Sequence, residues 1–270
     1  MRLHLAFMLC ARTSWSAAKE QQNLIQMSIQ SMITSTKAIP EPLQLLSAYL
    51  GGVIYQGTGN LDQALDIYQS DTCSLQNYRR TAHHSQIHLN IVLLSALNTI
   101  LIIRTPTHPK HDQLPSLLSF LESLCTRNPI RQIQSAYHLL TATNPSSSTI
   151  LLTKQALQSA LQTAKQSENN QLMCMVLNLM SWKFFRGVVG EQSEKSAQAS
   201  QRLAQKCMDA LWMSVAAGVL GDTLEAAGRF EEAKKARESG EVTAIGLPEA
   251  LQAAMRSENG DVDVAMVDQP

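Results

Sequence analysis

The stretch "YLGGVIYQGTGNLDQALDIYQ", Tyr49 to Gln69, decides how the rest of the chain is interpreted. Its Gly57-x-Gly59 pair lies between a β-like run and a helix-like run, which is how a dinucleotide-binding loop begins. The third glycine of that fingerprint lets the helix pack closely on the strand, but Asp62 stands here, and its charge would face the pyrophosphate. The residues before Tyr49 also favour a helix over a strand. The glycines therefore need another explanation.

An internal repeat supplies that explanation. The segment "GGVIYQGTGNLDQALDIY" aligns without gaps on "LGDTLEAAGRFEEAKKAR" nearer the C-terminus. This order of small, bulky and glycine positions is typical of a tetratricopeptide (TPR) helix hairpin. The aligned pairs are Gly52 with Gly221, Tyr55 with Leu224, Gly59 with Gly228, Asn60 with Arg229, Leu61 with Phe230, and Ala64 with Ala233.

The small residues predict where the two helices of each hairpin cross. A side chain larger than a methyl group would push the two backbones apart at these points. Tyr55 and Tyr68 are expected to fill the seam to the next repeat. The predicted crossing residues are Gly52, Ala64, Gly221 and Ala233, and the glycines expected to end the first helix in a left-handed turn are Gly59 and Gly228.

Fainter copies of the pattern extend the array, and we predict an all-α fold, an α-solenoid of TPR-like antiparallel helix hairpins in a right-handed superhelix. The copies are "LMSWKFFRGVVGEQSEKSAQA", "LAFMLCARTSWSAAKEQQ" and "TKQALQSALQTAKQ". With 44% hydrophobic residues the chain can bury a large core, and one elongated array is favoured over two globules. The expected helices are Leu43 to Thr58, Leu61 to Ser70, Arg80 to Ile103, Leu151 to Lys165, Gln171 to Gly187, Gln192 to Lys206, Trp212 to Ala227 and Phe230 to Glu238.

The array is predicted to occupy residues 1–240, with Gly240 closing the last hairpin. Residues 241–270 carry six acidic residues against one basic residue and cannot bury enough surface to fold, which indicates an acidic, disordered tail. The proline-containing segment from Ile102 to Ser116 is expected to be a loop inserted between repeats.

Charge and cysteine content narrow the function. Only 16% of residues are charged, the formal net charge is zero and no basic run exists, so direct nucleic-acid binding is not expected. The polar remainder is Gln, Ser, Asn and Thr, which suits an obligate protein partner. Five scattered cysteines indicate reduced core thiols in a cytosolic or nuclear protein.

Two apolar stretches resemble membrane signals, but each has a second interpretation. Leu3 to Ala11 follows Arg2 as a short signal sequence would, yet no convincing cleavage site follows, and a first-repeat helix is favoured. Ile87 to Ile103 is apolar nearly all round, but it contains His88, Asn90 and Asn98, as a helix buried inside a solenoid can.

The sequence offers no arrangement that predicts catalysis. His84 and His88 are four residues apart, but no cysteine lies at ligand spacing, so a zinc site is not expected. No nucleophile with a plausible base and no phosphate loop is present either. We therefore expect neither enzymatic activity, nor a metal, nor a cofactor.

Residues Asn169 to Ala233, and "MSWKFFRGVVGEQ" within them above all, resemble the C-terminal repeats of the fungal cohesin loading factor family. The resemblance covers roughly Pro42 to Gly240. It implies a non-enzymatic superhelix in the nucleus that binds the extended N-terminal segment of the large adherin subunit and supports the loading of cohesin onto chromatin and sister chromatid cohesion. Family members carry a longer N-terminal array, so the resemblance implies a C-terminal part, a truncated or partial member, and incomplete enclosure of the adherin segment.

The first helix of a TPR hairpin lines the concave groove, so the repeat register selects candidate partner-binding residues. Trp182 and Phe185 could instead be core residues, but their polar companions favour the groove. A TPR co-chaperone would need a basic cluster there, and a signalling ATPase fragment or helical-repeat transcription activator would need a phosphate loop. The groove candidates are Tyr49, Val53, Gln56, Asn178, Trp182, Phe185, Arg186, Asp222 and Glu225.

Overall fold

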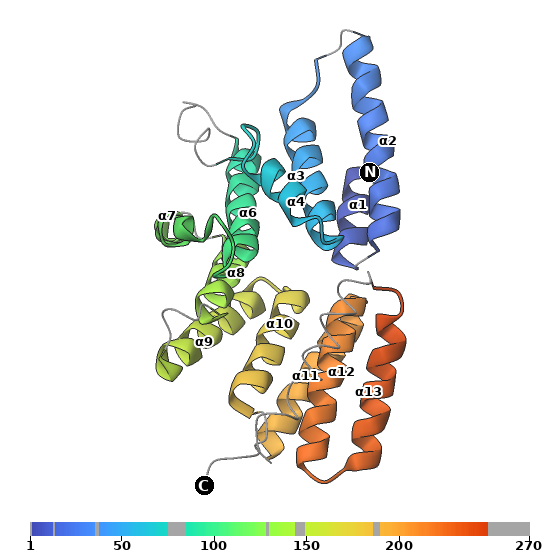
Figure 1. Ribbon diagram of the computed structural model, residues 1–270, viewed down its shortest axis with the longest axis vertical. Helices are drawn as coiled ribbons and strands as arrows, with labels where there is room; N and C mark the ends of the chain where they lie inside the picture. The colour runs from blue at the N-terminus through green and yellow to red at the C-terminus, as the bar shows by residue number, and fades with distance from the viewer. Residues whose placement is uncertain are drawn as a thin grey trace. The chain divides into compact units, whose positions relative to one another are not determined.

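The computed structural model describes residues 2–12, 14–35, 38–74, 85–127, 130–143, 149–185 and 190–247. All regular structure within these ranges is helical, and neighbouring helices pack on one another (Figure 1), which confirms the all-α helical-repeat prediction. The chain divides into two compact units, residues 1–176 and 177–270. The handedness of a superhelix along the whole chain stays a prediction.

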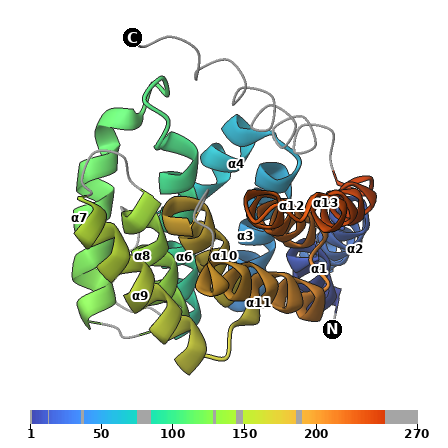
Figure 2. The same cartoon turned by 90° about the horizontal axis from the view of Figure 1, so that it is seen from below.

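The first unit is a series of helix pairs. Helices α1 and α2, α3 and α4, and α8 and α9 pack as hairpins, while α6 contacts α3, α4, α7 and α8. Figure 2 shows α8 and α9 lying side by side. The elements are α1 (Arg2–Ala11), α2 (Trp15–Thr34), α3 (Glu41–Gly57), α4 (Leu61–Tyr68), α6 (Gln86–Ile103), the 3-10 turn η1 (His111–Gln113), α7 (Leu114–Arg127), α8 (Arg131–Thr143) and α9 (Ile150–Gln166).

Helix α10 (Asn170–Met180) carries the chain into the second unit and continues as the π-helical turn η2 (Ser181–Phe185). Helices α11 (Glu191–Cys207), α12 (Ala210–Ala226) and α13 (Phe230–Ala244) follow, with α12 packed against both of its neighbours. Asp209, itself buried, caps α12 by accepting a hydrogen bond from the backbone N–H of Trp212 at 3.2 Å. A stripe of small buried residues on α11 allows the close packing of this unit.

The predicted helices are confirmed to within a few residues, except that α6 begins at Gln86 and not at Arg80, because Ser85 is extended and caps the helix by accepting a hydrogen bond from the backbone N–H of His88. Residues 186–187 of another predicted helix lie outside the described ranges. Helices α7 and α8 were not predicted. Helix α7 begins inside the segment expected to be a loop, because Pro115 stands in its first turn, where proline removes no intrahelical hydrogen bond.

Gly240 does not close the last hairpin. It lies within α13, which continues to Ala244, and a Cβ added to it would lie 3.0 Å from the Cβ of Ala217 on α12. Gly240 is thus a further crossing point between the two helices. The rest of the predicted acidic tail, from residue 248 onward, lies outside the described residues.

The glycines of the opening stretch mark close approaches between helices, as predicted. A Cβ added to Gly52 would lie 2.5 Å from the Tyr68 ring of α4, and one added to Gly221 would lie 2.8 Å from Cγ of Arg237 on α13. Gly59 and Gly228 have φ values of 83° and 76°, the left-handed conformation expected after each first helix.

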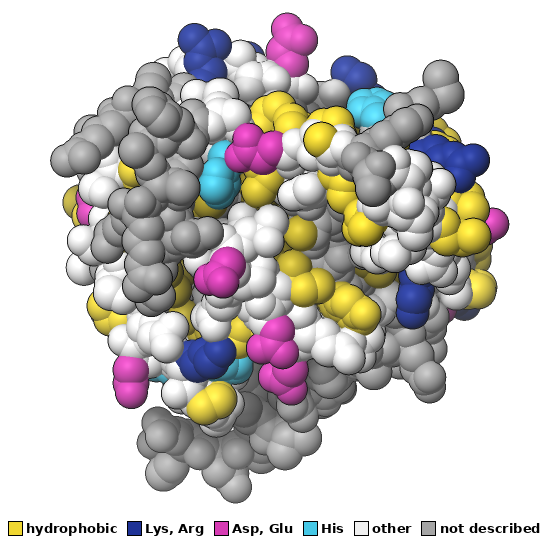
Figure 3. All heavy atoms as spheres, turned by 90° about the horizontal axis from the view of Figure 1, so that it is seen from above, with side chains coloured by type: hydrophobic (Ala, Val, Ile, Leu, Met, Phe, Trp, Pro, Cys, Tyr) yellow, Lys and Arg dark blue, Asp and Glu magenta, His cyan; other side chains and the backbone are white. Residues whose placement is uncertain are grey.

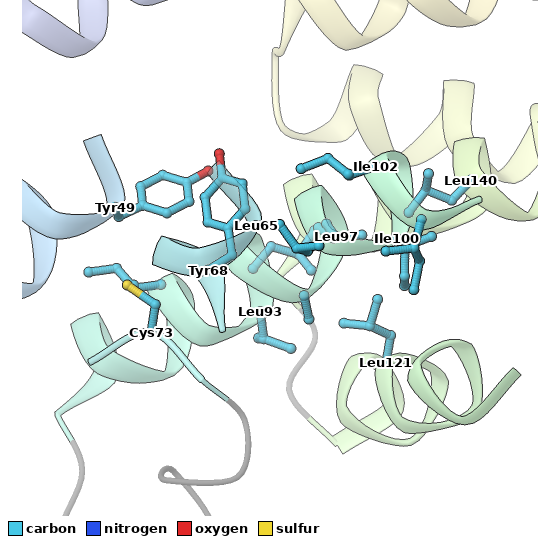
Figure 4. Close-up of a cluster of buried hydrophobic side chains, with 14 of the residues drawn as sticks. Tyr49, Leu65, Tyr68, Cys73, Leu93, Leu97, Ile100, Ile102, Leu121 and Leu140 are labelled. Carbon is cyan, nitrogen blue, oxygen red and sulfur yellow. The ribbon is translucent and has the colours of Figure 1, made fainter. Parts of the chain in front are cut away.

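Helix α6 is the centre of the first unit's core. It is the one helix in the described part of the chain that is long and apolar enough to cross a membrane, yet 67% of it is buried inside the fold. Figure 4 shows its Leu93, Leu97 and Ile100 among buried side chains of the neighbouring helices. This packing explains why the helix is apolar on nearly every face.

A polar network connects α3, α4 and α6 inside this apolar core. The Asn98 side-chain amide donates to the hydroxyl oxygens of Tyr49 at 3.1 Å and Tyr68 at 3.2 Å, and the Tyr68 hydroxyl donates to Gln56 at 2.9 Å. Figure 4 shows the two tyrosine oxygens close together. Burial raises the pKa of both tyrosines, which stay neutral donors and acceptors. Tyr68 therefore fills the seam between repeats, as predicted.

The two glycines of α12 provide a matched test of the crossing. Gly221→Leu should lower the free energy of unfolding by about 1–3 kcal/mol, because the new side chain meets α13. Gly218→Leu, where nothing lies within 4 Å of an added Cβ, should raise stability by about 0.5–1 kcal/mol through helix propensity. Denaturant unfolding measures the stability of both variants. Equal changes in the free energy of unfolding would contradict a close helix crossing at Gly221.

The polar network can be tested on α6. Asn98→Leu should lower the free energy of unfolding by about 1–3 kcal/mol, because a buried tyrosine hydroxyl loses its donor. Asn90→Leu, on the same helix, removes only a bond to Gln86 near the surface and should change stability far less. Thermal and denaturant unfolding measure both variants. If both lose the same free energy of unfolding, the hydrogen bonds of Asn98 to the two tyrosines do not stabilise the fold.

Candidate partner-binding surfaces

The groove residues predicted on α3 lie on its packed face. Tyr49 is only 9% exposed and stacks on Phe7, with ring centroids 6.0 Å apart. Val53 and Gln56 are half-buried, and Gln56 accepts the hydrogen bond from Tyr68. The reason is geometric: residues three before and four after Gly52 share its helix face, and α4 covers that face. The prediction that this face of α3 is an open groove is therefore wrong.

Of the groove residues predicted around η2, one is buried and one is exposed. Asn178 is 3% exposed and lies three residues before Ser181, whose hydroxyl donates to Ser196 of α11 at 3.0 Å. Trp182, one residue further round the helix, is 48% exposed. The side chain of Phe185 and all of Arg186 lie outside the described residues. Turns of π-helix are rare and often occur at functional sites. The exposed Trp182 on such a turn is therefore a candidate for partner binding.

Asp222 and Glu225 reach the solvent but are paired. Both carboxylates accept hydrogen bonds from the Arg237 guanidinium of α13, at 2.9 Å for Asp222. Their side chains are 40% and 48% exposed. A second network on the same unit joins Arg229 to Glu194 at 2.7 Å and to Glu232. Exposed pairs of this kind contribute little to stability.

The first unit contains a groove between α2 and α3 that was not predicted from the sequence. We call it the amide groove, and its volume is about 440 Å³. Its α2 wall carries amide side chains at helical spacing, and its α3 wall is largely apolar. The lining residues are Lys19, Gln22, Asn23, Gln26, Met27, Ile54, Tyr55 and Thr58.

Two glycines bring the walls of the amide groove together. A Cβ on Gly51 would lie 2.7 Å from the Gln22 amide nitrogen, and a Cβ on Gly57 would lie 2.4 Å from the Trp15 ring. Without those side chains, α2 lies close against α3 and holds Gln22 over the α3 backbone. The signal in the sequence was the run of Gln and Asn at three- and four-residue spacing on α2.

The chemistry of the amide groove fits an extended peptide. An amide side chain both donates and accepts, so it can bond the N–H and C=O of a partner backbone. Met27, 69% exposed, supplies an adaptable apolar contact. Lys19 is the charged group among the described residues that line the groove, and none of those residues is a carboxylate. The surface thus favours a segment with acidic residues.

A second polar surface follows α9 in the same unit. It has a volume of about 470 Å³ and is lined by Gln155, Gln158, Ser159, Leu161, Gln162 and Lys165. It repeats the chemistry of the amide groove, because its described lining residues include several amides and one lysine but no carboxylate. Glutamine-rich surface thus recurs on this unit.

Charged side chains elsewhere are mixed in sign. On the face shown in Figure 3, Lys and Arg stand singly among Asp and Glu, and the described residues form no extended basic area there. Nucleic-acid binding would need such an area to neutralise phosphates.

The titratable side chains of the described residues are placed for packing and not for catalysis or metal binding. Within the described ranges, no three His, Cys, Asp or Glu side chains come together as metal ligands would, and His84 lies outside them. All five cysteines are free thiols, and all but the half-buried Cys207 are buried, as predicted for core thiols. Burial raises the pKa of Cys10 to about 12 and that of Cys125 to about 11. These thiols are poor nucleophiles.

Of three comparisons with known proteins, one gives a match. No curated protein and no solved structure matches the chain. A family model described as cohesin loading factor matches residues 1–231. That match begins at residue 1, well before the Pro42 at which the sequence resemblance begins, and includes both the amide groove and the turn that carries Trp182. The chain belongs to the cohesin loading factor family, and its role is in cohesin loading.

Proposed function

We propose that this chain is a non-enzymatic helical-repeat scaffold that binds the N-terminal segment of the adherin subunit and so supports the loading of cohesin onto chromatin and sister chromatid cohesion. Family membership supports the cohesin-loading role. The observation that carries the binding proposal is the amide groove, whose lining residues match the needs of an extended peptide.

The groove would act on backbone and charge together. Gln22, Asn23 and Gln26 bond the main chain of the segment, while Lys19 pairs with an acidic side chain. Met27 and Tyr55 contribute the apolar contact area that gives such interfaces most of their binding energy. Recognition of this kind tolerates sequence variation in the partner, because the main chain is the same in every peptide.

Trp182 is the second element of the proposal. A half-exposed indole supplies large, rigid contact area and one N–H donor, the features that make tryptophan common among energetically important interface residues. Asp222 and Glu225 remain further candidates on the second unit, where a basic partner group would compete with Arg237.

The proposed location is the nucleus, at chromatin and through the partner. Mixed surface charge and zero formal net charge support indirect contact with DNA. A general TPR adaptor or co-chaperone that grips a peptide carboxylate is the alternative. The single lysine in each of the two amide-rich surfaces argues against it, because carboxylate capture in TPR grooves depends on clustered cations.

The amide groove can be tested by titration of the full chain with the purified adherin N-terminal segment. Lys19→Glu combined with Gln26→Ala should weaken binding by about 1–2 kcal/mol, because both side chains are exposed lining residues. Helix content should not change.

The matched control is Lys206→Glu combined with Gln30→Ala, which makes the same changes outside the groove. Calorimetry should give it the affinity of the parent chain. If the groove variant also binds like the parent, the groove is not the site.

Trp182 is tested in the same titration. Trp182→Ala should weaken binding by at least about 2 kcal/mol through the loss of aromatic contact area. Phe230→Ala removes another aromatic side chain of the second unit, one that is 65% exposed, and should leave affinity unchanged. An equal loss for both variants would indicate a general effect on folding, and no loss for Trp182→Ala would remove it from the interface.

A further inference from the structure

The chain contains one place where serine or threonine precedes proline, Thr105–Pro106. The pair comes directly after the last residues of α6, and Thr105, Pro106 and Thr107 are all exposed. A unique Thr–Pro pair on an exposed turn is a substrate signature that neither cohesin loading nor the proposed peptide groove requires.

The backbone presents Thr105 in a defined turn. The N–H of His108 donates to the carbonyl of Thr105 at 2.9 Å, which closes a β-turn with Pro106 at its second position, where proline is favoured. The rest of the loop is attached to the core: the Lys110 ammonium donates to Gln69 of α4 at 2.7 Å, and the His111 ring contacts the Ile103 carbonyl at 3.1 Å. The threonine is therefore held at the surface and not folded under the loop.

We propose that Thr105 is the acceptor of a proline-directed protein kinase. The Thr105 hydroxyl oxygen attacks the γ-phosphorus of ATP, its proton passes to the catalytic carboxylate of the kinase, and ADP leaves. Pro106 fits such an enzyme for two reasons. It has no backbone N–H that would lose a partner in the kinase cleft, and it biases the preceding residue toward the extended conformation in which substrates bind.

The phosphate would act on the end of α6. Arg104, the C-cap of that helix, donates to the Thr143 hydroxyl of α8 at 3.3 Å. A phosphothreonine next to it carries nearly two negative charges, and a guanidinium binds a phosphate more strongly than it binds a neutral hydroxyl. Arg104 would then leave Thr143. An anion at a helix C-terminus also opposes the helix dipole, so the modification loosens the contact between α6 and α8 at this end.

The test uses the intact chain, ATP and a purified proline-directed kinase, with intact-mass and fragment mass spectrometry. The expected result is one added phosphoryl group, located on Thr105. Thr105→Val and Pro106→Ala should abolish it, while Thr107→Val, two residues away in the same turn, should retain it. A circular dichroism spectrum of each variant confirms that the helices are intact.

Three results would overturn the proposal: no incorporation into the folded chain, incorporation at other residues alone, or equal incorporation in Pro106→Ala. A synthetic peptide covering residues 98–112 serves as the control for kinase activity. If the peptide is modified and the folded chain is not, the turn protects Thr105 and the site is refuted.

The loosened contact between α6 and α8 can be measured by hydrogen exchange. Hydrogen exchange should be faster in the last turns of α6 and α8 of the phosphorylated chain than in the unmodified chain, with α12 unchanged as an internal reference. Equal exchange at all three would refute the effect on the contact between α6 and α8.

Discussion

The close approach of α3 to the helices on both of its sides is the constraint on which the first unit depends. Gly52 admits the Tyr68 ring from α4, while Gly51 and Gly57 admit Gln22 and Trp15 from α2. Interiors packed at crystal density leave no room for an added methyl at such positions. Because α3 contacts α2, α4 and α6, it contributes to two clusters of buried side chains, one shared with α1 and α2 and one shared with α4 and α6, and the amide groove follows from the approach of α2.

Polar bonds give that core its specificity. Packing of apolar side chains tolerates rearrangement, whereas a buried donor that loses its acceptor is costly. Asn98 reaches both Tyr49 and Tyr68, so α3, α4 and α6 satisfy one another's polar groups in one arrangement. In the second unit, small residues at the helix crossings select one arrangement of the helices. Gly221 lies against Ala233 and Gly240 against Ser214 and Ala217, which allows α12 and α13 to approach closely at both points.

The surface is consistent with a protein that works by holding another chain. Few residues are charged, and the amide groove and the polar surface along α9 are lined by amides with one lysine each among their described residues. Amides bond a partner's main chain without the desolvation penalty that an unpaired charge would carry. This chemistry gives a physical basis for a member of the cohesin loading factor family that acts as a scaffold.

The sequence by itself determined most of the helices, though not α7 and α8, together with the hairpin turns at Gly59 and Gly228 and the crossing points at Gly52 and Gly221, because backbone conformation and the size of one residue are local properties. It did not determine which face of α3 stays open. Residues at the spacing of Tyr49 and Gln56 line a groove or fill a core according to what covers them, and α4 and α6 cover them here. Only the tertiary structure decided that the open wall is formed by α2 and the other side of α3, since exposure depends on neighbours distant in the sequence.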